Sequence, residues 1–303
     1  HEQKQGDKFI NNVVKLYNLG HKTIGSMNKE KHNKISKTNP TNLSGVPATL
    51  LISLRARCLE SLDPKGVIKD ERSVEIARTL GCDITPRSES FFTQVGTAQR
   101  TIVFDDYTND FLSRYPNGTI VNLACGLDTR FERLDNGQVK WFDLDFPDVI
   151  EIRRQFFKES ERYHFIEKSV LDFTWLDEVP KDRPVFISAE GLFCYFTENQ
   201  VREVLTRVAK AFDNVEFVIE AINPFMVKHS DRHPSMKGQE ARFKWGIKSG
   251  REIDAWNTGF YFENERYYML ECKRRALSVR FMCLFPFFGK SMKIFLLKNI
   301  KTK

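Results

Sequence analysis

Acidic residues stand at the ends of several predicted strands, where they could bind the hydroxyl and amino groups of a ligand. Asp145 ends one apolar run and lies 19 residues after Gly126, which follows the preceding run. This separation matches the spacing at which a carboxylate beside a glycine turn accepts hydrogen bonds from ribose hydroxyls. Strand alternation puts Asp143 on the same face, so either acid could serve. We favour Asp145 because it ends the strand.

Two further acids follow the next predicted strands. Asp172 could accept a hydrogen bond from an adenine amino group, or it could only cap the short helix after it. Glu190 ends an apolar run directly before Gly191, and an unpaired buried carboxylate is costly, so we expect it to meet a cationic partner. Acids or small turns at four successive strand ends together indicate a ligand that contains a nucleoside.

The turn at Gly126 argues against a nicotinamide dinucleotide. That cofactor favours G-x-G-x-x-G, whereas this turn has one glycine followed by Asp128, which would repel a pyrophosphate. The chain also has no Tyr with a Lys four residues later, the pair that short-chain dehydrogenases use. S-adenosylmethionine has no phosphate and carries a positive sulfonium and ammonium, so it suits an acidic pocket better.

These acids must be positioned by the predicted strands and helices, which appear in the sequence as short apolar runs that alternate with amphipathic stretches. Strands are predicted at 119–124, 139–145, 163–168, 184–189, 215–222 and 292–298, and helices between them at 147–160, 174–179 and 197–212. This alternation is typical of a parallel sheet covered on both faces. Before the first strand, the pattern predicts a helical arm within residues 1–40 and helices at 47–60, 70–80 and 97–115. The fold class is therefore α/β, a doubly wound Rossmann-like sheet with an N-terminal helical cap.

Two joined segments carry a family resemblance. The run from Val121 to Phe131 reads VNLACGLDTRF, and the run from Val139 to Ile150 reads VKWFDLDFPDVI. With SVLDFTW at 169–175 and AEGLFCYF at 189–196, the chain resembles the leucine carboxyl methyltransferase and TcmP-like O-methyltransferase family from about residue 43 to 222. The resemblance implies a class I methyltransferase fold that uses S-adenosylmethionine.

The resemblance also implies roles for particular residues. By position, Arg100 would pair with the carboxylate of the cofactor, and Ala124 and Gly126 would lie along its methionine part. Asp145 would hold the ribose, and Leu171 and Asp172 would flank the adenine. Glu190 and Tyr195 would lie beside the amino group of the cofactor and beside the acceptor. Ala124 stands where the family has its usual first glycine. Because alanine adds only a methyl group, we expect the fold to be unaffected.

The chemistry of the acceptor decides whether a base is needed. Methyl transfer is an in-line displacement, in which the enzyme mainly aligns the reacting atoms and excludes water. A carboxylate acceptor is already ionised, whereas a hydroxyl needs a base, for which His164, His229 and His233 are candidates. His229 and His233 follow the fifth predicted strand, where an acceptor pocket is expected, although they could also belong to a solvated polar loop. Their spacing implies no metal site.

The leading functional prediction is an O-methyltransferase that modifies a carboxylate or hydroxyl of a small molecule, either polyketide-like or another metabolite. The alternatives are a protein C-terminal carboxyl methyltransferase and a catalytically silent cofactor-binding scaffold. We expect residues 1–117 to form the arm and cap, and residues 118–303 the S-adenosylmethionine-binding domain, with an acceptor insertion at about 223–260. The sequence leaves the acceptor's identity and the oligomeric state open.

Charge and composition limit the classes of partner that the protein is expected to bind. The formal charge of +7 divides into +5 in residues 1–40, +9 in residues 273–303 and therefore −7 in between. The acidic middle, together with the lack of any nucleic-acid-binding motif, argues against a nucleic-acid partner. No apolar run is long enough to cross a bilayer and no signal peptide is visible. The six cysteines form no C-x-x-C pair, so we expect a reducing, cytoplasmic setting.

Overall fold

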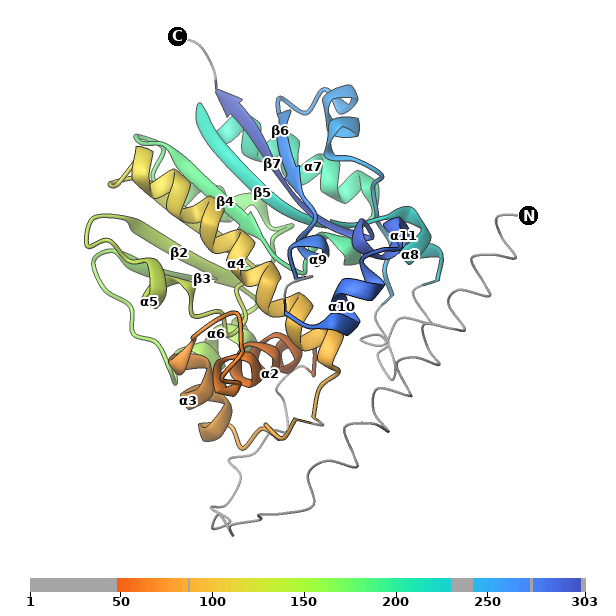
Figure 1. Cartoon of the computed structure of the whole chain (residues 1–303). Coiled ribbons are helices and arrows are strands. Elements are labelled where there is room, and N and C mark those ends of the chain that lie inside the picture. The colour runs from red at the N-terminus through yellow and green to blue at the C-terminus, as the bar shows by residue number, and fades with distance from the viewer. Residues whose placement is uncertain (1–47, 87, 230–241, 273–274, 301–303) are drawn as a thin grey trace, which may run out of the picture. The chain divides into compact units, whose positions relative to one another are not determined.

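A computed structural model describes residues 48–86, 88–229, 242–272 and 275–300, so the predicted arm in residues 1–40 lies outside the described residues. Its centre is one sheet in the order β3-β2-β1-β4-β5-β7-β6 (Figure 1). The strands are β1 (Thr119–Leu123), β2 (Lys140–Asp145), β3 (Tyr163–Glu167), β4 (Val185–Ala189), β5 (Asn214–Ile222), β6 (Tyr261–Arg266) and β7 (Met292–Ile300). Each of the six predicted strands is present with shifts of one or two residues at its ends.

The parallel arrangement holds for five strands only. β1 pairs in parallel with β2 and β4, and β2 with β3 and β4 with β5 in the same way. β7 runs antiparallel between β5 and β6 and pairs with β5 along its whole length. The sequence pattern does not predict β6, because this edge strand is largely exposed and lacks an apolar alternation.

Among the described residues, three helices precede the sheet: α2 (Ala48–Leu62), α3 (Glu71–Thr79) and α4 (Phe91–Arg114). The N-cap side chain of α3 is Asp70, which accepts from the backbone N–H of Ser73. α4 begins six residues before the predicted start at Thr97, because it runs through Gly96. A side chain there would meet the sulfur of Met269 at 3.0 Å, so this glycine lets α9 pack closely on α4.

The remaining helices are short apart from α7. They are α5 (Arg130–Leu134), α6 (Pro147–Arg153), η1 (Phe173–Asp177), η2 (Phe193–Tyr195), α7 (Glu198–Ala211), α8 (Pro224–Lys228), η5 (Gly250–Trp256), α9 (Tyr268–Glu271), α10 (Leu277–Met282) and α11 (Pro286–Gly289). The predicted cap at Thr197 is confirmed, with a reciprocal capping box to Gln200. The predicted helix at 147–160 ends at Arg153.

Two apolar clusters lie on opposite faces of the sheet. One joins Ile120 and Trp141 to α2, α3 and α4, and the other joins Val121 and Phe142 to α7. Successive strand residues belong to different clusters because side chains alternate across a strand. α4 crosses one face of the sheet in Figure 1. The predicted doubly wound α/β class is confirmed.

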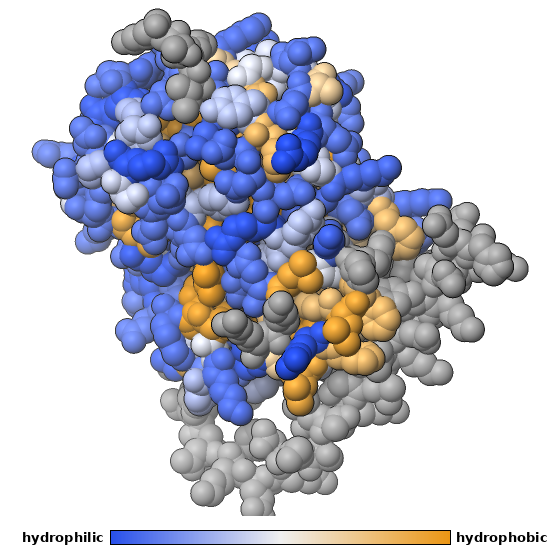
Figure 2. All heavy atoms as spheres, turned by 45° about the horizontal axis from the view of Figure 1, so that its top comes forward, coloured by the Kyte–Doolittle hydropathy of each residue, from blue (hydrophilic) through white to orange (hydrophobic). Residues whose placement is uncertain are grey.

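The surface is mainly polar on the face drawn in Figure 2, with apolar side chains gathered in one part of it. Among the described residues, the most exposed large apolar side chains are Leu277 and Leu284, at 82% and 70%. Both lie in the basic C-terminal segment, in and just after α10. In the part of the chain that the structure describes, every helix is too short or too polar to cross a bilayer.

Candidate functional site

The turn after β1 forms one wall of the site. Ala124 and Gly126 both have positive φ, at 52° and 51°, in the left-handed region that favours glycine. The buried guanidinium of Arg153 donates to the carbonyl oxygens of Gly126 and Asp128, each at 2.8 Å. The turn is therefore held in a conformation that places its backbone at the carboxyl end of β1.

Asp145 lies directly against this turn. Its carboxylate accepts from the backbone N–H of Gly126 and from that of Phe146, each at 2.8 Å. Burial raises the pKa of Asp145, and these two hydrogen bonds oppose the rise. A carboxylate can accept about four hydrogen bonds, so Asp145 retains acceptor positions for a ligand.

Asp143 has a different environment on the same strand. Its carboxylate accepts from the indole N–H of Trp141 at 3.0 Å and from the hydroxyl of Tyr163 at 2.5 Å, and it pairs with Arg153. The side chain is fully buried. Strand alternation left both acids as candidates for the ribose contact. Asp143 links β2 to β3 and α6, whereas Asp145 lies beside the turn after β1.

Glu190 meets two cations, as the sequence predicted. One carboxylate oxygen lies 2.9 Å from Nε of Arg100 in α4, and the other lies 2.7 Å from Nη2 of Arg130 in α5. Burial would raise the pKa of Glu190, but the two guanidiniums hold it below its usual value. The carboxylate at the end of β4 is therefore ionised at neutral pH.

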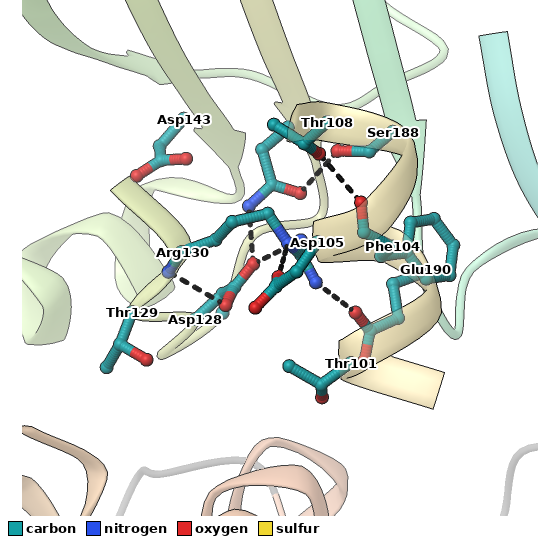
Figure 3. Close-up of polar contacts among 12 residues, drawn as sticks. Thr101, Phe104, Asp105, Thr108, Asp128, Thr129, Arg130, Asp143, Ser188 and Glu190 are labelled. Carbon is teal, nitrogen blue, oxygen red and sulfur yellow. Dashed lines mark hydrogen bonds and ion pairs between the residues drawn. The ribbon is translucent and has the colours of Figure 1, made fainter. Parts of the chain in front are cut away.

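Arg130 was not predicted as a site residue. Its side chain is 1% exposed and forms ion pairs with Asp105 at 2.7 Å, Asp128 at 2.6 Å and Glu190 (Figure 3). These acids come from α4, from the turn after β1 and from the end of β4. A basic residue two positions after Asp128, in the turn that follows a predicted strand, is the signal in the sequence that could have identified it.

Glu220 was also missed. It lies on β5 and accepts from Nη1 of Arg100 at 3.0 Å, from the backbone N–H of Gly191 at 2.8 Å and from the hydroxyl of Tyr268 at 2.8 Å. Gly191 has a φ of +66°, so the turn after Glu190 needs a glycine. An acid inside the apolar run of β5 was the available signal, since the same argument applies to Glu190.

The residues expected near an adenine lie at the carboxyl end of β3. Leu171 is half-buried and Asp172 is exposed. The carboxylate of Asp172 accepts from the backbone N–H of Thr174 at 3.2 Å and from its hydroxyl at 2.7 Å, and these bonds lower its pKa. The helix-capping interpretation of Asp172 is therefore confirmed, and the side chain remains exposed.

Aromatic side chains follow β4 and β5. The rings of Tyr195 and Phe243 lie 5.7 Å apart. His229, just after α8, stacks on Phe225, and its Nδ1 lies 2.9 Å from the carbonyl oxygen of Phe225. Burial raises the pKa of Tyr195 well above its usual value, so its hydroxyl stays protonated and can donate a hydrogen bond.

Of the other two candidate histidines, His164 does not join this group. His164 is the second residue of β3, stacks on Phe142 and lies away from the carboxyl end of its strand. It is therefore badly placed to serve as a base. His233 lies outside the described residues.

Comparisons with known proteins identify the family of the chain. A family model for leucine carboxyl methyltransferase matches residues 51–209. The tetracenomycin polyketide synthesis O-methyltransferase TcmP of Streptomyces glaucescens is 33% identical over 238 residues, covering 76% of this chain and 85% of that protein. The S-adenosyl-L-methionine-dependent methyltransferase dpfgK of Gibberella zeae is also 33% identical, over 251 residues, covering 75% of this chain and 84% of that protein.

Solved structures show the same fold. A protein of Thermobifida fusca, described as a methyltransferase, has a TM-score of 0.53 at 15% identity, covering 82% of this chain and 94% of that one. The sheet order is that of the shared α/β fold, and the family model together with the two relatives defines the chain as a methyltransferase. Within that class, the chain belongs to the leucine carboxyl methyltransferase family.

Proposed function

We propose that this methyltransferase transfers the methyl group of S-adenosylmethionine to a carboxylate oxygen of a small molecule. S-adenosylmethionine is its cofactor, as the names of several relatives state for those proteins. The observation that carries the cofactor part of the proposal is the pair formed by the Asp145 carboxylate and the Gly126 turn, with Glu190 at the neighbouring strand end. The choice of a carboxylate acceptor rests on Tyr195, as argued below.

The charges around Glu190 fit a positively charged ligand. Four acids meet three arginines there: Asp105, Asp128, Glu190 and Glu220 against Arg100, Arg130 and Arg133. Asp145 adds a further negative charge, because among the described residues it forms no ion pair. The resulting excess of negative charge suits a sulfonium and an ammonium.

Different residues of this chain bind different parts of the cofactor. When bound, the cofactor supplies an electrophilic methyl group on a positively charged sulfur. We assign Asp145 to the ribose hydroxyls, Ala124 and Gly126 to the methionine part, Leu171 and Asp172 to the adenine, Glu190 to the amino group and Arg100 to the carboxylate. Nη2 of Arg100 forms no hydrogen bond within the described part of the chain, which leaves that donor for the ligand.

A carboxylate acceptor suits the groups on the acceptor side. The protonated hydroxyl of Tyr195 can donate to a carboxylate but is a poor base. A carboxylate needs no base, since it is ionised at neutral pH. The family model that matches the chain is named for carboxyl methylation, and TcmP, named as an O-methyltransferase in polyketide synthesis, favours a small-molecule acceptor. Tyr195 would then orient the attacking oxygen.

The pH dependence of the rate tests this choice of acceptor. With a carboxylate, the rate should stay nearly constant between about pH 6.5 and 9, because no proton is removed. His229→Ala and His233→Ala should each retain most of the activity. The measurement is the initial rate of S-adenosylhomocysteine formation across this range, with Tyr195→Phe as the variant expected to lose activity.

A hydroxyl acceptor would give the opposite result. The rate would then rise with pH through the pKa of a base, and loss of that base would slow the reaction by roughly 10²–10⁴-fold. Such a profile, removed by His229→Ala or His233→Ala, would replace the carboxylate by a hydroxyl and assign the histidine as the general base.

A further inference from the structure

We propose that Arg130 is a positioning residue that fixes the orientation of the Glu190 carboxylate toward the cofactor's amino group. The proposal rests on the function assigned above, in which Glu190 receives that group. Arg130 itself is 1% exposed and its three nitrogens are all used by acids, so it acts through Glu190 and not by touching the ligand.

The guanidinium of Arg130 is fixed on three sides. Nε contacts Asp105, Nη1 contacts Asp128 and Nη2 contacts Glu190, at distances between 2.6 and 2.7 Å. Figure 3 shows the head group of Arg130 between these acids. A planar fork held by two carboxylates presents its third donor in one direction only. That direction is set by α4 and by the turn after β1.

The Glu190 carboxylate is correspondingly restrained. One oxygen is held by Arg130 and the other by Arg100. The next residue, Gly191, is held through its backbone N–H by Glu220. One cation at each oxygen leaves each oxygen a second acceptor position. The two remaining acceptor positions keep a fixed direction as long as both arginines hold the carboxylate in place.

The same helix contains a matched control. Arg133 also lies on α5, is 15% exposed and pairs with Asp105 at 3.0 Å. It also pairs with Asp70 at 3.2 Å and more distantly with Asp128 at 3.9 Å, and it forms no ion pair with Glu190. A change at Arg133 therefore disturbs the same helix and the same two acids, Asp105 and Asp128, but removes no ion pair of Glu190.

The test compares Arg130→Lys and Arg133→Lys in the full-length chain. Lysine keeps the charge but loses the planar fork, so it cannot contact three acids in this geometry. Titration calorimetry with S-adenosylhomocysteine should show about 10–100-fold weaker binding for Arg130→Lys, the value of a hydrogen bond to a charged group. Arg133→Lys should bind within about threefold of the unmodified chain, a change that corresponds to less than 1 kcal/mol.

A second background separates positioning from general loss of structure. In Glu190→Gln, the ionised target of Arg130 is gone, so adding Arg130→Lys should weaken binding by less than about threefold. If Arg130→Lys does not fold, Asp105→Ala takes its place, since it frees Nε and should give a smaller loss that also vanishes with Glu190→Gln.

Four results would count against the account, and they overturn different parts of it. Equal losses for Arg130→Lys and Arg133→Lys, or full additivity with Glu190→Gln, would overturn the positioning role alone. Unchanged binding by Glu190→Gln would overturn the role of Glu190 and the positioning role that depends on it. No binding of S-adenosylhomocysteine by the unmodified chain would overturn the proposed function itself.

Discussion

Replacing Arg100 with methionine is expected to lower the free energy of unfolding by about 3–5 kcal/mol, the cost of breaking a buried ion pair by removing one partner. Arg100 is bound by Glu190 at 2.9 Å and by Glu220 at 3.0 Å, and the side chains of these acids are only 13% and 8% exposed. Without the cation, Glu220 keeps only neutral partners. Urea unfolding at pH 7 measures the change.

Two further measurements check the cause of this loss. The double variant Arg100→Met with Glu220→Gln should recover part of the lost stability, because one of the unpaired charges is removed with the cation. The loss should also shrink in acid. The folded-state pKa of Glu190 lies below its usual value, so its stabilising contribution is present above the unfolded-state pKa and disappears as the pH falls through the folded-state pKa. A loss below about 1 kcal/mol at pH 7 would contradict the burial of this pair.

Asp145→Ala and Asp143→Ala are expected to affect different properties, cofactor binding and stability of the fold, although the two acids lie only two residues apart. Asp145→Ala should weaken cofactor binding by about 1.5–3 kcal/mol, because it removes a charged acceptor from the ribose, and should leave the chain folded. Asp143→Ala should destabilise the fold by about 3–5 kcal/mol, because it leaves the buried Arg153 without its carboxylate.

Calorimetry with S-adenosylhomocysteine and urea unfolding measure both quantities for both variants. Asp143→Glu offers a charge-preserving control, which keeps the carboxylate opposite Arg153 and should recover part of the stability. Weak binding by a stable Asp143→Ala variant, together with normal binding by Asp145→Ala, would reverse the assignment of the ribose contact.

Local patterns predicted the part of the site that depends on strand ends. The spacing from Gly126 to Asp145 was enough to bring the two together, because adjacent parallel strands end at the same edge of the sheet. The same reasoning predicted a cation at Glu190, since a buried carboxylate needs one. The site roles of Leu171, Asp172 and Tyr195 remain predictions that rest on the family resemblance.

Long-range pairing explains what the sequence left open. Arg130 and Glu220 find their partners 60 and 120 residues away, and no local period marks such pairs. The start of α4 was missed because a glycine inside a helix is locally unfavourable, and only its contact with α9 explains it. β6 was missed because an exposed edge strand needs no apolar alternation.

The central claim is best tested by following the methyl group itself. The full-length chain is incubated with S-adenosylmethionine labelled on the methyl group and with matched aromatic acids and phenols, and each product is then treated with mild alkali. We predict label on a carboxylic acid, with an equal amount of S-adenosylhomocysteine, and release of that label as methanol, as expected of a methyl ester. Label on the phenols in preference to the acids, in a form that resists alkali as a methyl ether does, would contradict the proposed function.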